Sequence, residues 1–207
     1  MVIDRIQLYK NDLPNDLIIN GDLAIDTEAM GLNNKRDRLC LVQISDEIGN
    51  IYIIQFDKGV TTAPNLKKLL STPETQKIFH FARFDVAVIH QYLGITVNNI
   101  FCTKIASKLV RTYTDSHGLK DICREFLSIQ VSKQQQSSDW GSEILTKEQK
   151  IYAANDVLHL HKLRDKLKTL LIREERLDLA QACFDFIPSR ALLDLAGWNE
   201  IDIFAHH

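Results

Sequence analysis

Several features that define common protein classes are scarce or missing in this sequence. Its four cysteines, Cys40, Cys102, Cys123 and Cys183, are widely spaced and form no C-x-x-C pair, so neither a disulfide framework nor a zinc ribbon is expected. Free thiols in a reducing compartment fit this spacing better, and we expect a cytoplasmic protein. No apolar run approaches the roughly 18 residues of a membrane span. The N-terminal residues also lack the basic start and apolar middle of a secretory signal.

An excess of charge of one sign is also missing. The chain has 25 Lys and Arg residues against 27 Asp and Glu residues, which gives a net charge of -2. The protein as a whole therefore has no positive field that could hold nucleic acid, and any phosphate binding has to depend on a local group of residues. The 207 residues are enough to bury a sizeable core, and one domain is the expected arrangement.

Short apolar runs that alternate with turns fill the first half of the chain. The runs at 39–45 and 51–56 flank Gly49-Asn50 and predict an antiparallel hairpin. Residues 22–26 and 77–80 are typical of strands, whereas 64–70 and 84–94 have helical spacing. Strands followed by helices, with an early hairpin, indicate an α/β fold with a mixed sheet flanked by helices.

The second half is predicted to be helical. Residues 121–127 have helical spacing, and Thr146 with Gln149 three residues later forms a capping-box pattern. One long helix is then expected from the apolar residues spaced three and four apart, which are Val157, Leu160, Leu163, Leu167 and Leu170. The tail after residue 177 predicts one or two further helices around Pro188.

The first candidate for chemistry is the pair Asp26 and Glu28, at the end of an apolar run. In a strand the two carboxylates project from the same face, where they repel each other unless a positive charge lies between them. Oxygen donors at this spacing suit Mg²⁺ or Mn²⁺. Taken alone, the pattern is also that of an acidic strand end in a solvated loop, which is the commoner case.

Two further candidates lie on predicted helices. Asp85 follows the strand at 77–80, where a lone Asp usually faces the helix macrodipole. Tyr152 and Asp156 are four residues apart, so the phenol and the carboxylate project from one helix face. A core Tyr beside a solvent-facing Asp has the same spacing, so each of these patterns has a purely structural alternative.

Together, these three candidate motifs resemble those of the DEDD superfamily of 3′→5′ exonucleases. The resemblance is to its tyrosine subgroup, and most closely to the ribonuclease D family. The resemblance extends through residues 112–120 and 138–141 to the third motif, Tyr152-Ala153-Ala154-Asn155-Asp156. The histidine subgroup has His five positions before the last Asp, where this chain has Ile151. Many members carry Asn where Phe81 falls in the second motif.

The resemblance implies a ribonuclease H-like fold with a mixed five-stranded sheet. It also implies one exonuclease domain over residues 1–207, with C-terminal helices from about residue 173 packed on it and no additional helical RNA-binding domain. Two divalent cations, Mg²⁺ or Mn²⁺, are expected as cofactors. The implied catalytic residues are the four metal ligands and a tyrosine that orients the attacking water: Asp26, Glu28, Asp85, Asp156 and Tyr152.

By the same resemblance, the expected reaction is removal of nucleotides from single-stranded 3′ ends of RNA, with release of nucleoside 5′-monophosphates. Substrate contacts are expected from Thr27, Ala29 and Met30, although a Met after a strand is more often part of the core. Trp140 is expected in the core beneath the Tyr152 helix rather than stacked on a base. Basic residues that are candidates to line the path of the strand are Arg83, Lys104, Lys108, Arg111, Lys120 and Lys133.

Three alternative functions stay open. A DNA exonuclease of the same superfamily would share the metal chemistry and differ in contacts to the sugar 2′-hydroxyl. A catalytically silent nucleic-acid-binding module would keep the fold and lose turnover. A protein scaffold with accidental acids would have to explain three acidic motifs in the expected order.

Overall fold

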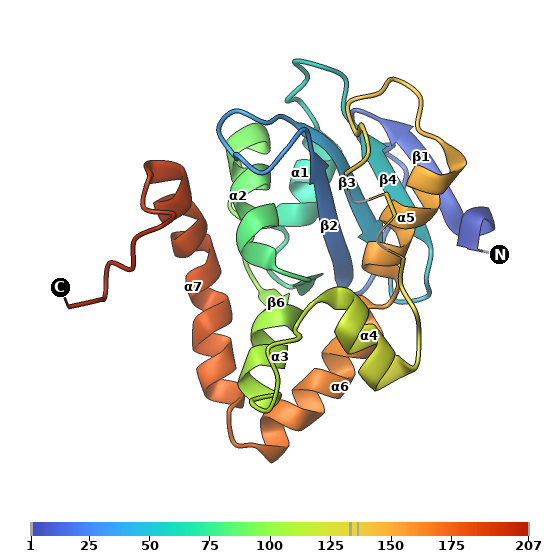
Figure 1. Cartoon of the computed structure of the whole chain (residues 1–207). Coiled ribbons are helices and arrows are strands. Elements are labelled where there is room, and N and C mark those ends of the chain that lie inside the picture. Colours follow the sequence, from blue (N-terminus) through green and yellow to red (C-terminus); the bar gives the residue numbers. More distant parts are fainter. Residues whose placement is uncertain (1, 133, 136, 207) are drawn as a thin grey trace.

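Within the residues that the structure describes, this protein has one six-stranded sheet. The structure is a computed structural model, and it describes residues 2–132, 134–135 and 137–206 (Figure 1). The strands are β1 (Ile6–Lys10), β2 (Leu23–Ala29), β3 (Leu39–Ser45), β4 (Ile51–Gln55), β5 (Lys77–Phe79) and β6 (Ile100–Cys102). Their order across the sheet is β1-β4-β3-β2-β5-β6. A short 3₁₀ helix, Val2–Arg5, precedes β1.

Two helices alternate with the later strands, and the second half of the chain is helical, as the sequence predicts. They are α1 (Pro64–Ser71), α2 (Ala82–Leu93), α3 (Thr103–Val110), α4 (Leu119–Leu127), α5 (Lys147–Leu158), α6 (Leu160–Arg173) and α7 (Leu177–Ala196). The capping box at α5 is confirmed, because Thr146 Oγ1 accepts from the Gln149 amide and the Gln149 side chain accepts from the Thr146 amide.

The sheet is mixed, which confirms the predicted fold class. Strands β3 and β4 form the expected antiparallel hairpin, and β2 pairs antiparallel with β3 and parallel with β5. The sheet has six strands rather than five, because β1 adds in parallel to β4 at one edge. Residues 6–10 are mostly exposed, so their sequence lacks the apolar pattern from which a strand could be predicted.

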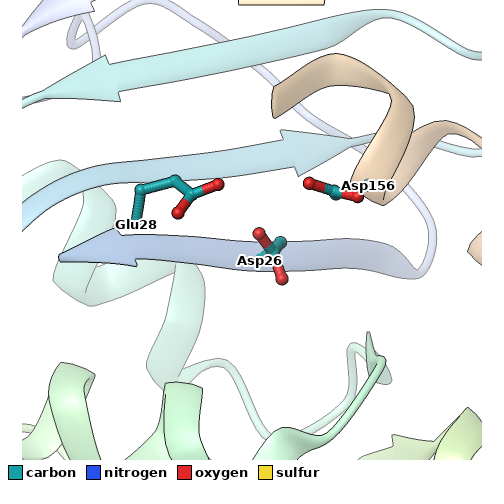
Figure 2. Close-up of side chains that lie close together, drawn as sticks. All are labelled: Asp26, Glu28 and Asp156. Carbon is teal, nitrogen blue, oxygen red and sulfur yellow. The ribbon is translucent and has the colours of Figure 1, made fainter. Parts of the chain in front are cut away.

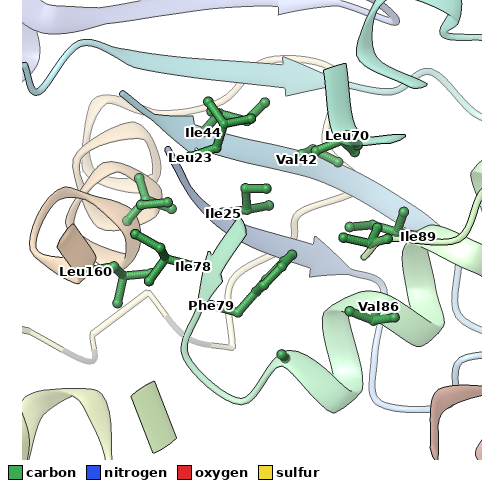
Figure 3. Close-up of a cluster of buried hydrophobic side chains, with 14 of the residues drawn as sticks. Leu23, Ile25, Val42, Ile44, Leu70, Ile78, Phe79, Val86, Ile89 and Leu160 are labelled. Atoms are coloured by element: carbon green, nitrogen blue, oxygen red, sulfur yellow. The ribbon is translucent and has the colours of Figure 1, made fainter. Parts of the chain in front are cut away.

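The two faces of the sheet are covered by different helices. Ile25, Val42 and Ile44 point to one face, where they pack with Leu70 of α1 and Ile89 of α2 (Figure 3). Because side chains alternate along a strand, the neighbouring residues of β2 and β3 point to the opposite face. Helix α5 covers that face, in contact with β2, β3 and β4 (Figure 1).

The predicted long helix after Thr146 is wrong in one respect, because it is two helices. Helix α5 ends at Leu158 and α6 begins at Leu160, with His159 between them. The apolar spacing runs on across this junction, so the pattern alone hides the break. Leu171 rather than Leu170 is fully buried on α6.

The C-terminal helix is continuous. Helix α7 extends through Pro188 and packs along α2 and α3 (Figure 1). A proline inside a helix usually breaks it by removing a hydrogen bond. Here Phe184 and Ile187 are buried before the proline and Ala191 is buried after it, so packing holds the helix on both sides. Among the described helices, none combines the length and the apolar character needed to cross a membrane.

Candidate active site

Three carboxylates converge where β2 passes beneath α5. Asp26 and Glu28 project from the same face of β2, and Asp156 reaches toward them from α5 (Figure 2). One oxygen of each carboxylate lies within 4.8 Å of the others. Residues that are 130 positions apart in the chain are thus brought together, as the acidic motifs predict.

Local structure explains how the three side chains meet. The two-residue period of a strand puts Asp26 and Glu28 on one face, while Thr27 between them points to the other. The capping box fixes the start of α5, and from that start Tyr152 and Asp156 lie one turn apart on the face that meets β2. The buried Ala153 and Ala154 let this helix approach the sheet closely.

The fourth predicted acid, Asp85, lies outside the group of three. It is buried in the first turn of α2, where its Oδ1 accepts hydrogen bonds from the Thr27 amide at 3.0 Å and from Thr27 Oγ1 at 2.7 Å. Asp85 is therefore joined to the strand that carries Asp26 and Glu28. It does more than face the helix macrodipole, which was its structural alternative.

Burial and mutual repulsion dominate the electrostatics of the site. Burial raises the pKa of Asp26 to about 7, opposed by a hydrogen bond from the Thr27 backbone. Burial and then the charge of Asp26 raise the pKa of Asp156 to about 8. Burial, followed by the charges of the other acids, raises the pKa of Glu28 to about 10. Burial and the charge of Asp26 hold the pKa of Asp85 well above its usual range. These acids cannot all ionise without compensating positive charge.

Tyr152 stands beside the acids as a neutral phenol. Burial, followed by the charges of Asp156, Glu28 and Asp26, raises its pKa above the ordinary value for tyrosine. Its ring lies 5.9 Å from that of Trp140, and Trp140 is buried. The core position expected for Trp140 is confirmed, and Tyr152 is wedged between that indole and the carboxylates.

The donor set fits a hard divalent cation. Within the described part of the chain, Asp26, Glu28 and Asp156 are the group of acidic, His or Cys side chains whose ligand atoms lie this close together. All of their donors are carboxylate oxygens, which Mg²⁺ and Mn²⁺ prefer. A bound cation also supplies the positive charge that these carboxylates need in order to ionise together.

A pocket of about 330 Å³ opens over the acids. Its walls include Thr27, Tyr152 and two of the predicted basic residues, Lys104 and Lys120. His80 and Ser132 also line it and carry no signal in the sequence. Phe81, which stands where many family members have Asn, lines it as well. Phe81 is the one with a visible signal, since it falls in the second motif. It is 44% exposed, has a φ of 72° and carries the Lys104 ammonium 4.2 Å from its ring centroid.

The predicted substrate contacts are divided between two hollows. Thr27 borders the carboxylate pocket, whereas Met30 borders a neighbouring hollow with Arg36 and Arg38. Met30 is 52% exposed, so the alternative that it belongs to the core is wrong. Ala29 sits at a register shift between β2 and β3, where the strand turns toward Met30.

Of the other predicted basic residues, those that the structure describes lie away from the pocket or are paired elsewhere. Arg83 pairs with Asp194 at 2.6 Å, and the buried Arg111 pairs with Glu125. Lys108 is exposed on α3. Lys133 lies outside the described residues. Both arginines are thus used in ion pairs within the fold. The sequence could not show this, because the partner of each arginine is not close to it in the chain.

Comparison with known proteins identifies the class. A family model described as 3′-5′ exonuclease matches residues 7–172. The chain belongs to this family of metal-dependent 3′-5′ exonucleases of the DEDD type. Among solved structures it is similar to NrnC of Brucella melitensis, with 55% sequence identity, a TM-score of 0.95 and coverage of 98% of both chains. NrnC has also been solved with bound Mg²⁺ and bound to pGG.

Two curated relatives are longer than this chain. Ribonuclease D of Gluconacetobacter diazotrophicus is 32% identical over 156 residues, which cover 75% of this chain and 39% of that protein. DNA polymerase I of Aquifex aeolicus is 37% identical over 186 residues, which cover 86% of this chain and 30% of that protein. The chain thus spans well under half the length of either relative.

These comparisons confirm the predicted family, the ribonuclease H-like exonuclease fold and the class of enzyme. Enzymes of the DEDD family use two divalent cations, as expected from the acidic motifs. The relatives include proteins named for RNA and for DNA, so the nature of the nucleic acid is a separate question.

Proposed function

We propose that this protein removes nucleotides from the 3′ end of single-stranded RNA and releases nucleoside 5′-monophosphates. The convergence of Asp26, Glu28 and Asp156 within 4.8 Å carries the proposal. Asp85 serves as the fourth acid of the site, and Tyr152 is its fifth catalytic residue. The exonuclease domain takes in residues 1–207, with α7 packed on it.

The four acids hold the cations in this proposal. Asp26 is central, because its charge contributes to the raised pKa of Glu28, Asp85 and Asp156. When bound, two divalent cations lower the pKa of an attacking water and stabilise the charge that develops on the phosphate and on the leaving oxygen. The NrnC structure with bound Mg²⁺ supports this assignment.

Tyr152 orients the attacking water. Its raised pKa keeps the phenol protonated at neutral pH, so it donates a hydrogen bond rather than taking a proton. Contact with the Trp140 ring limits rotation of the phenol. A fixed donor beside the scissile phosphate lowers the barrier by positioning the reactants.

The pocket is suited to a chain end. At about 330 Å³, it is at the lower end of the roughly 300–1,000 Å³ range of small-ligand sites. A terminal nucleotide is the part of a nucleic acid that fits such a volume. Lys104 and Lys120 at its wall supply positive charge for phosphate. Thr27, Ala29 and Met30 border the path of the substrate on the β2 side. The complex of NrnC with pGG supports a short single-stranded substrate.

A DNA exonuclease is the second candidate, favoured by the similarity to a part of DNA polymerase I. Incubation of 5′-labelled single-stranded RNA, single-stranded DNA and labelled pGG with Mg²⁺, Mn²⁺ or EDTA separates the two. We expect products that shorten from the 3′ end, faster on RNA, with no cleavage in EDTA. Faster cleavage of DNA would favour the second candidate, and internal cuts or cleavage in EDTA would overturn the mechanism.

The variant Asp26→Asn tests whether the protein turns substrate over at all. The substitution keeps the size of the side chain and removes its charge. Cleavage is expected to fall by about 10³-fold or more while thermal unfolding still shows a folded protein. A catalytically silent binding module would instead show no metal-dependent cleavage in either form.

A further inference from the structure

Gln43 is a buried amide directly opposite Asp26. It lies in the middle of β3, where its Cα is paired with that of Asp26 on β2 and with that of Ile53 on β4. Residues that are directly opposite in an antiparallel pair have Cβ atoms about 4.5–5.5 Å apart and point to the same face. Gln43 therefore shares the α5 side of the sheet with Asp26.

The amide of Gln43 has no hydrogen-bond partner among the described residues. Its side chain is 0% exposed, and both Nε2 and Oε1 are buried and unpartnered. Leaving such a group unpaired in the interior is unfavourable, so native proteins rarely keep one without a reason. If the residue between Asp26 and Ile53 had a structural role alone, an apolar side chain there would make the fold more stable.

Gln55 gives the matched comparison on the same face. It lies on the neighbouring strand β4, is 3% exposed, and donates from Nε2 to the Ser142 carbonyl at 2.8 Å. Its amide thus holds the loop that leads to α5. The same residue type, one strand away, has a structural bond that Gln43 lacks.

We propose that Gln43 is a positioning residue for Asp26, whose carboxylate accepts a hydrogen bond from the Gln43 amide in the cation-bound site. The inference rests on the proposed function. Rotation of either side chain about its own torsions is enough to bring a donor and an acceptor together at this Cβ separation. The bond holds the Asp26 carboxylate in one orientation, as hydrogen bonds behind metal ligands commonly do.

The neutral amide is the suitable donor for this place. A Lys or Arg opposite Asp26 would compete with the cations for the carboxylate. A second acid would add to the repulsion that already raises the pKa of Glu28 and Asp156. Glutamine supplies N–H donors without charge, and so it orients Asp26 without weakening cation binding.

Titration calorimetry with Mn²⁺ and Mg²⁺ on the variant Gln43→Met tests the inference, with Gln55→Met as the control. Met keeps the length of the side chain and removes both polar groups. We expect Gln43→Met to bind the cations about 10–100-fold more weakly, and its melting temperature in EDTA to be unchanged or higher. Gln55→Met should show the reverse, with a lower melting temperature and wild-type affinity. If Gln43→Met does not fold, Gln43→Leu gives the same comparison.

Wild-type affinity in a folded Gln43→Met or Gln43→Leu protein would overturn the role of Gln43. Asp26→Asn, measured alongside, separates this failure from failure of the proposed function. If Asp26→Asn loses cation binding and the Gln43 variants do not, the proposed function stands and the inference is wrong. If Asp26→Asn also binds as the wild type does, both are wrong.

Discussion

Thr27 and Asp85 join β2 to α2 through two hydrogen bonds on one carboxylate oxygen, at 3.0 Å from the Thr27 amide and 2.7 Å from its hydroxyl. Thr27 stands between the two acids of β2, and Asp85 lies in the first turn of α2, which covers the opposite face of the sheet. The contact therefore sets the position of the fourth acid relative to the other three.

The variant Thr27→Val removes the hydroxyl bond and keeps the shape of the side chain. We expect the free energy of unfolding to fall by about 0.5–1.5 kcal/mol, because a buried hydrogen bond is lost while the Thr27 amide still donates to the same oxygen. Cleavage should fall about tenfold, since Asp85 is less firmly held. Thr27→Ser keeps the hydroxyl and is the control. Equal behaviour of the two variants in urea unfolding and cleavage assays would contradict this account.

Removal of the Tyr152 hydroxyl tests its proposed role. For Tyr152→Phe we expect kcat to fall by roughly 100-fold through poorer positioning of the water. The alkaline side of the pH–rate profile should keep its shape, since the phenol stays protonated there. Tyr9→Phe, at the far edge of the sheet, should leave kcat unchanged. A limb of the profile that disappears only in Tyr152→Phe would assign the phenol as a base.

Cation affinity should depend on pH. The pKa values of about 7, 8 and 10 for Asp26, Asp156 and Glu28 mean that the cation-free site holds protons at pH 7. Ligating carboxylates have to lose those protons, so affinity rises as pH increases from about 6 to 9. Calorimetry in two buffers of different ionisation enthalpy measures the protons released. Constant affinity with no proton release would show that the acids are already ionised.

The hairpin, α2 and the start of α5 could be predicted because each depends on local signals. A Gly-Asn turn between β-branched runs, a Gly at a helix end and a capping box all act within a few residues. The convergence of Asp26, Glu28 and Asp156 followed from the order of the acidic motifs. That inference drew on resemblance, since no single motif contains the geometry.

Other features depend on packing that the sequence does not display. The break at His159 lies inside an unbroken apolar pattern, and Pro188 is tolerated because α7 is held against α2 and α3. Arg111 looks like a candidate for phosphate binding, yet it is buried against Glu125. The pairing of Gln43 with Asp26 depends on strand register, which composition does not fix.

Buried Lys77 makes stability depend on pH. Its side chain is fully buried on β5, its Nζ donates to the Thr72 carbonyl, and burial lowers its pKa to about 8. The unfolded chain keeps the ordinary value of about 10.4. Between these values the unfolded state binds more protons, so the contribution of Lys77 to stability rises with pH.

Lys77→Met should therefore be more stable than the wild type at pH 7, by roughly 1–3 kcal/mol. The difference in unfolding free energy between the two proteins should shrink from pH 7 toward pH 10. Comparing them at each pH cancels the contribution of the acids. A difference that does not vary with pH would mean that Lys77 keeps its ordinary pKa in the fold.

The most direct test of the site is the number of Mn²⁺ ions bound per chain, measured by calorimetry on the wild type and on Asp26→Asn. Asp26 lies at the centre of the acidic group, so we expect two ions per wild-type chain and loss of both tight sites in the folded variant. Two ions bound with unchanged affinity by Asp26→Asn would contradict the assignment of these carboxylates as the metal site.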